Sequence, residues 1–139
     1  MVEKQRTIKQ AVSVTGVGLH TGKPVTITFL PAPENHWYKF QRMDLEGQPV
    51  IEADADLVVD TSRGTTLEKN GARVYTTEHV LAALVGLSID NCLIQMTAPE
   101  MPIMDGSSWK FIEALESAGI LEQEAERTYF ELKENLTYE

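Results

Sequence analysis

The sequence is poor in cysteine, in long apolar runs and in positive charge, and each shortage excludes a class of protein. Its single cysteine, Cys92, excludes an intramolecular disulfide framework and a cysteine-based zinc finger. The longest apolar run, residues 80–87, is far shorter than the roughly 20 residues that a transmembrane helix needs. The net charge of −9, from 12 lysines and arginines against 21 aspartates and glutamates, argues against binding to nucleic acid or anionic lipid. Because no apolar signal segment follows residues 2–6 and the cysteine is a free thiol, we expect a cytoplasmic protein.

The composition and length of the chain suit one folded domain. An apolar share of 42% and a charged share of 24% exclude a disordered chain, and 139 residues are enough for a hydrophobic core. Residues 6–60 are rich in β-branched side chains and predict strands, including a hairpin whose turn lies at residues 16–22, a third strand near residues 37–40 and a short fourth one at residues 54–60. A further tight hairpin is predicted around Asn70-Gly71, because both central residues of a type I′ turn need a positive φ.

Two helices are predicted in the second half. The first begins at Thr76 or Thr77 and ends near Gly86, and it is apolar almost all round, which predicts that it is buried. A buried strand is predicted at residues 89–96. The second helix begins at Ser107 or Ser108 and ends at Gly119. Its apolar positions recur at helical spacing and are expected to face the core: Trp109, Ile112, Leu115 and Ala118.

This order of elements predicts an α+β fold, a two-layer sandwich in which two helices cover a mixed or antiparallel sheet. The end of the chain differs in composition, since residues 113–139 hold eight glutamates against Arg127 and Lys133. We interpret this acidic segment as a solvated face rather than an interaction tail. Residues 135–139 look like a strand that begins and is then cut.

The adjacent pair Glu78-His79, at the start of the apolar helix, is the strongest candidate for chemistry. A neutral imidazole can bind a metal while a carboxylate beside it takes a proton from water that the metal activates. The residues alone leave a second reading open, because a glutamate in a first helical turn also complements the helix dipole, and a nearby histidine is often only on the surface.

Two further positions are open in the same way. His20 lies in a turn flanked by glycines, which serve either the hairpin alone or the close approach of a ligand. Cys92 lies on the predicted buried strand, without a neighbouring cation in the sequence to activate it, and we interpret it as core.

Four stretches together resemble one family, the zinc-dependent UDP-3-O-acyl-N-acetylglucosamine deacetylase of lipid A biosynthesis. They are KQRTIK at residues 4–9, TGVGLHTG at residues 15–22, TTEH at residues 76–79, and IDN at residues 89–91 continuing to APEMPIMDGS at residues 98–107. Their order and spacing match over essentially the whole chain.

The resemblance implies a role for five residues. His79 matches the one zinc ligand that the first of two related α+β domains contributes, and Glu78 matches the general base. Leu19 and His20 match residues close to the catalytic zinc. Gly64 lies in a stretch, residues 61–66, that lines the active-site cleft in the family, and it stands where some relatives have a bulkier residue.

The resemblance also implies what lies elsewhere. In the family the other two zinc ligands, a histidine and an aspartate, come from the second domain, as does a further histidine. Residues 1–126 therefore match the first domain and residues 127–139 the opening strand of the second. We expect this chain alone to bind Zn²⁺ weakly and to be inactive. Some members are fused to a dehydratase that acts on hydroxyacyl carrier protein. The alternative is a non-catalytic binding or assembly module of the same fold.

Overall fold

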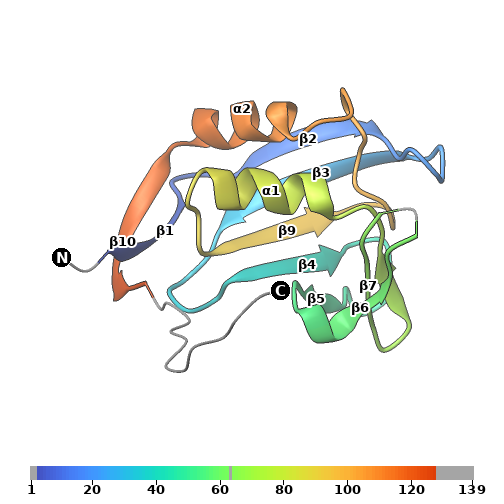
Figure 1. The fold of residues 1–139 in the computed structure, drawn as a ribbon, viewed down its shortest axis with the longest axis horizontal. Coiled ribbons are helices and arrows are strands. Elements are labelled where there is room, and N and C mark those ends of the chain that lie inside the picture. Colours follow the sequence, from blue (N-terminus) through green and yellow to red (C-terminus); the bar gives the residue numbers. More distant parts are fainter. Residues whose placement is uncertain (1–2, 63, 128–139) are drawn as a thin grey trace, which may run out of the picture.

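The computed structural model describes residues 3–62 and 64–127, and their elements form two layers (Figure 1). One layer is a five-stranded sheet with the strand order β2-β3-β9-β4-β5. Its strands are β2 (Val12–Val17), β3 (Pro24–Pro31), β9 (Cys92–Met96), β4 (Tyr38–Arg42) and β5 (Val50–Glu52). The other layer consists of α1 (Glu78–Gly86) and α2 (Trp109–Ala118), which lie on one face of this sheet.

The sheet is mixed, because β4 and β9 run parallel while the other neighbouring strands run antiparallel. The predicted α+β sandwich with two covering helices is therefore confirmed. Its core lies between the layers, where Phe29 of β3 meets Phe111 of α2 edge to face with ring centroids 6.4 Å apart. No helix in the described part of the chain is both long and apolar enough to cross a membrane.

Two small sheets lie at opposite ends of the main one (Figure 1). At one end β1 (Lys4–Ile8) pairs with β10 (Ile120–Glu126), and at the other β6 (Val58–Asp60), β7 (Thr66–Lys69) and β8 (Ala72–Val74) form a three-stranded sheet. The Asn70-Gly71 hairpin is confirmed, with φ of 52° and 85° at its two central residues.

The short strand predicted at residues 54–60 is wrong in its bounds. The fourth strand of the main sheet is β5, which ends at Glu52, and a 3₁₀ turn, η1 (Ala55–Leu57), separates it from β6. The turn forms because the side chain of Asp54 accepts a hydrogen bond from the backbone N–H of Asp56, which caps it.

The helices begin and end close to their predicted residues, but their buried faces differ. In α1, Val80, Ala83 and Leu84 are buried but Val85 is 64% exposed, so the predicted burial of this helix holds for one of its faces only. In α2 the buried residues are Phe111, Leu115 and Ala118, whereas Trp109 is 56% exposed. Trp109 is the first residue of α2, and the stripe that faces the sheet starts two residues later.

Strand β10 was not predicted. Its sequence has no continuous apolar run, and its three glutamates are exposed, in agreement with the solvated face expected for this acidic segment. The strand forms because its backbone pairs with β1, a contact between the two ends of the described chain. The predicted opening strand of a second domain, residues 127–139, lies outside the described residues except for Arg127.

The fully buried side chain of Asn91 joins three segments at this end of the molecule. Its amide group donates hydrogen bonds to Gln5 of β1 at 2.9 Å and to Gln123 of β10 at 2.8 Å. Its oxygen accepts the backbone N–H of Trp37 at 2.7 Å, and its backbone carbonyl accepts the hydroxyl of Thr7. A buried polar network of this kind stabilises only while every member is satisfied.

We therefore expect Asn91→Ala to lower the free energy of unfolding by about 2–3 kcal/mol, because it leaves buried donors and acceptors without partners. Urea unfolding followed by circular dichroism measures the change. Gln95→Ala is the control, since Gln95 makes a side-chain bond to Gln41 on a partly exposed face, and it should cost less than about 1 kcal/mol. Equal losses in the two variants would contradict the role of Asn91.

Candidate functional site

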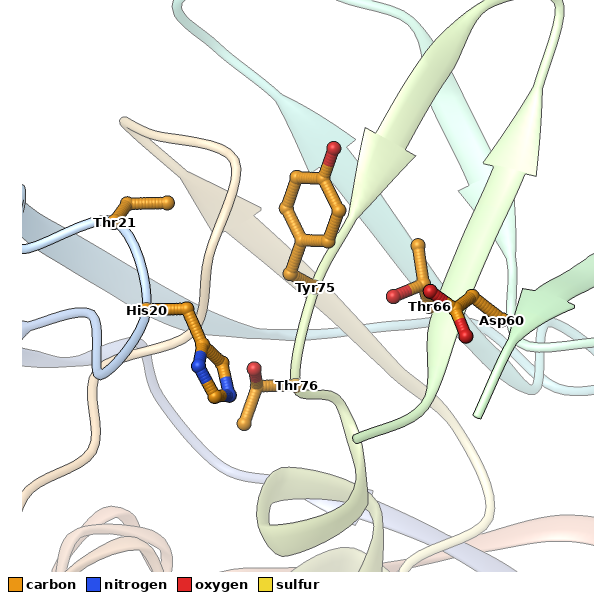
Figure 2. A pocket seen from close by; sticks show the side chains of 6 residues that line it. All are labelled: His20, Thr21, Asp60, Thr66, Tyr75 and Thr76. Carbon is orange, nitrogen blue, oxygen red and sulfur yellow. The ribbon is translucent and has the colours of Figure 1, made fainter. Parts of the chain in front are cut away.

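A cavity of about 270 Å³ lies between the β2–β3 turn and the three-stranded sheet (Figure 2). It is lined by His20, Thr21, Asp60, Thr66, Tyr75 and Thr76. Thr76 lies two residues before α1, so the first turn of that helix, with Glu78 and His79, begins beside the cavity. Of the predicted site residues, His20 lines the cavity itself.

Glu78 and Gly64, which the resemblance assigns to the same active site, lie close together. The backbone N–H of Thr65 donates a hydrogen bond to Oε1 of Glu78 at 3.1 Å. A Cβ atom at Gly64 would lie 2.9 Å from Oε2 of Glu78, and Gly64 has a φ of 112°, which side chains disfavour. Glycine therefore lets the backbone approach the carboxylate closely and hold it.

His79 follows in the same helical turn and is half-buried. Within residues 3–62 and 64–127, no group of three or more histidine, cysteine, aspartate or glutamate side chains is arranged to hold a metal ion. An imidazole ligand beside a carboxylate base suits zinc chemistry, but a catalytic zinc normally takes three protein ligands. The described residues thus supply a fitting but partial donor set.

Leu19 and His20 are exposed on the turn between β2 and β3, with Leu19 at 59%. This turn is held by the side chain of Glu100, a residue of the loop after β9. Its carboxylate accepts the backbone N–H of Thr21 at 2.8 Å and that of His20 at 3.0 Å. A Cβ atom at Gly18 would lie 2.4 Å from Oε1 of Glu100, so this glycine makes room for the carboxylate.

Glu100 is only 1% exposed, and its other oxygen accepts the hydroxyl of Thr76 at 2.8 Å. Burial by itself raises the pKa of a carboxyl group, but here the hydrogen bonds from Thr21, Thr76 and His20 outweigh it, and the pKa of Glu100 lies below its usual value. Sequence reasoning gave this residue no role. The sequence feature that could have pointed to Glu100 is its position as an acidic residue between Pro99 and Pro102, in a stretch that is otherwise apolar over residues 98–104.

Thr76 adopts a φ of 61° although it is β-branched and buried. Such a backbone costs on the order of 1–3 kcal/mol and persists only where its surroundings enforce it. The surroundings are visible on both sides: Tyr75 exchanges backbone hydrogen bonds with Pro99 and Met101, and Thr77 bonds to the carbonyl of Thr65 through its backbone and its hydroxyl. Because its hydroxyl is used in this way, Thr77 makes no side-chain cap on α1.

Cys92 takes no part in the site. It is fully buried on β9, and burial raises the pKa of its thiol to about 12, so it stays protonated at neutral pH. Its interpretation as a core residue is confirmed.

Comparisons with known proteins show which family the chain matches. The family model described as LpxC, UDP-3-O-acyl N-acetylglycosamine deacetylase, matches residues 5–139. A bifunctional enzyme LpxC/FabZ from Bacteroides thetaiotaomicron is 52% identical over 97% of this chain and 29% of its own length. A UDP-3-O-acyl-N-acetylglucosamine deacetylase from Methylococcus capsulatus is 48% identical over 98% of this chain and 45% of its own length.

The chain thus spans less than half the length of these relatives, from 29% to 45%. A match over nearly the whole chain, at this level of identity, goes well beyond a shared fold. The chain belongs to the LpxC family of UDP-3-O-acyl N-acetylglycosamine deacetylases, and it corresponds to their N-terminal domain.

Proposed function

We propose that this chain is the first domain of a zinc-dependent deacetylase. Joined to its second domain, it hydrolyses the 2-acetamido group of UDP-3-O-acyl-N-acetylglucosamine in lipid A biosynthesis. The names of its relatives support the substrate. The observation that carries the proposal is the carboxylate of Glu78, directly before His79 and beside the cavity that His20 lines. The backbone N–H of Thr65 holds this carboxylate, and Gly64 leaves room for it.

In this mechanism His79 would hold Zn²⁺ through a ring nitrogen, and the metal would supply Lewis-acid activation of water and of the acetamide carbonyl. Glu78 takes a proton from the attacking water, whose oxygen bonds to the carbonyl carbon. The carbon–nitrogen bond then breaks as a proton is delivered to the departing nitrogen, and the products are the free 2-amino sugar and acetate. Leu19, His20 and Gly64 contact the substrate or shape its cleft.

The remaining zinc ligands belong to the second domain of the same polypeptide. This assignment is supported by the length of the relatives, which extend far beyond the part that this chain matches. It is also supported by the apolar side chains that the helical layer and the site turn leave exposed within the described residues: Val85, Trp109 and Leu19. A second domain packed on this side covers them and brings its ligands to His79.

Two further properties stay predictions. A cytoplasmic location is expected for the enzyme. A fusion to a dehydratase is compatible with the relatives named LpxC/FabZ, while those named only as deacetylases are compatible with its absence.

Metal analysis and an acetate-release assay, run on this chain and on a protein extended through the second domain, test the proposal. We expect weak zinc binding and no turnover for the 139-residue chain, and both stoichiometric zinc and turnover for the longer protein. In the longer protein His79→Ala should lose zinc and activity. Glu78→Gln should keep zinc and lose about 10²–10⁴-fold in kcat, the usual contribution of a general base.

His36→Ala is the matched control, because His36 bonds through Nδ1 to the neighbouring carbonyl of Trp37 and lies outside the cavity. It should keep both zinc and activity. Turnover by the 139-residue chain alone, or full zinc and activity in His79→Ala, would contradict the proposal.

Gly64→Ala tests the support of Glu78. The added methyl group would lie 2.9 Å from Oε2 of Glu78, at a φ that alanine disfavours, so the carboxylate has to move. We expect kcat of the longer protein to fall about tenfold or more at unchanged zinc content, as displacement of a reacting group does. Gly86→Ala makes the same chemical change in open space and should leave kcat unaltered. Equal kcat values in the Gly64→Ala and Gly86→Ala proteins would contradict the proposed role of Gly64 in positioning Glu78.

A further inference from the structure

Three segments that are distant in the sequence meet at one buried carboxylate. They are the turn that carries His20, the segment just before α1, and the loop that carries Glu100. Backbone contacts bring them together, with bridges that pair Gly18 with Pro102 and Tyr75 with Glu100. The carboxylate of Glu100, in addition, bonds to both the His20 turn and Thr76.

The hydrogen-bond partners of Glu100 suit a charged acceptor. Oε1 accepts the backbone N–H groups of Thr21 and His20, and Oε2 accepts the hydroxyl of Thr76 and, at 3.2 Å, the same N–H of His20. An ionised carboxylate, which only accepts, forms all of these as charge-assisted bonds. A glutamine in the same place removes the charge, and its NH₂ group has to turn away from the backbone N–H groups and reverse the bond to the Thr76 hydroxyl, so the remaining bonds are weaker.

We propose that Glu100 is a positioning residue for the deacetylation, and that it holds the His20 turn in a set place relative to Glu78 and His79. This inference rests on the proposed function. The path is short: Glu100 bonds to Thr76, Thr76 lies two residues before Glu78, and His20 lines the same cavity as Thr76. Glu100 touches neither Glu78 nor His79 through any of its hydrogen bonds, so it acts through the turn rather than on the reacting atoms.

The surrounding fold does not depend on this carboxylate. Within the turn, the backbone N–H of Gly18 still bonds to Lys23, and that of Gly22 still bonds to Gly18. The loop stays attached through the bonds from Ile103 to Val17 and from Met101 to Tyr75. Loss of the charge therefore weakens the link between the turn and Thr76 without removing the turn itself.

Glu100→Gln in the two-domain protein tests the proposal. We expect kcat/KM to fall about ten- to hundredfold, mainly through kcat, at unchanged zinc content. Hydrogen exchange should become faster at the amides of His20 and Thr21, which lose a charged acceptor. Asp90→Asn is the matched control, because Asp90 also accepts a backbone N–H, that of Arg6, and pairs with Arg127, but it lies at the β1 end of the molecule. It should lower the melting temperature and leave kcat/KM within about twofold, the size expected of a change remote from the site.

A double-mutant cycle with His20→Ala separates positioning from general destabilisation. If Glu100 acts through the His20 turn, Glu100→Gln costs little more activity once His20 is alanine. Additive losses, or a kcat/KM in Glu100→Gln equal to that of Asp90→Asn, would overturn the proposal. If the unmutated two-domain protein releases no acetate, the proposed function is wrong. In that case the exchange rates of the amides of residues 20 and 21 still show whether Glu100 holds the turn.

Discussion

The carboxylate of Glu100 has to stay hydrogen-bonded, because it is nearly excluded from solvent and an unpaired charge there is costly. Its partners come from the β2–β3 turn and from the residue two positions before α1. The edge of the sheet sandwich and the start of the helical layer are thereby joined at one point. The left-handed backbone of Thr76 lies at the same junction, where backbone hydrogen bonds on both of its sides hold the chain.

The candidate site lies beside this junction. The sheet and the two helices bury the apolar side chains, and the cavity opens beyond them, where turn, hairpin and helix start converge (Figure 2). Glu78 accepts the backbone N–H of Thr65 beside this cavity. The described chain therefore presents a carboxylate held by the backbone and a neighbouring imidazole, but among the described residues no group of three side chains that could hold a metal ion.

The local pattern predicted most of the elements, for reasons that can be named. Asn70-Gly71 specified its hairpin because the two residues accept the positive φ that the turn needs. Thr76-Thr77 and Gly86 marked α1, and Gly119 marked the end of α2. Strand β10 was not predicted because backbone pairing with β1 stabilises it, and such pairing leaves no apolar pattern in the sequence. Trp109 was placed in the core because spacing alone does not tell where in the first turn the buried stripe begins.

For the site, the sequence by itself determined the residue types: the Glu78-His79 pair, the glycine-flanked His20 and the family to which the whole pattern belongs. It did so because these are contiguous motifs, readable without knowledge of the fold. Only the tertiary structure decided that Gly64 lies against Glu78, that Gly18 makes room for Glu100, and that Glu100 joins the turn to Thr76. These contacts span up to about 80 positions of the chain, as that from Glu100 to His20 does, and the packing of distant segments rather than any local pattern creates them.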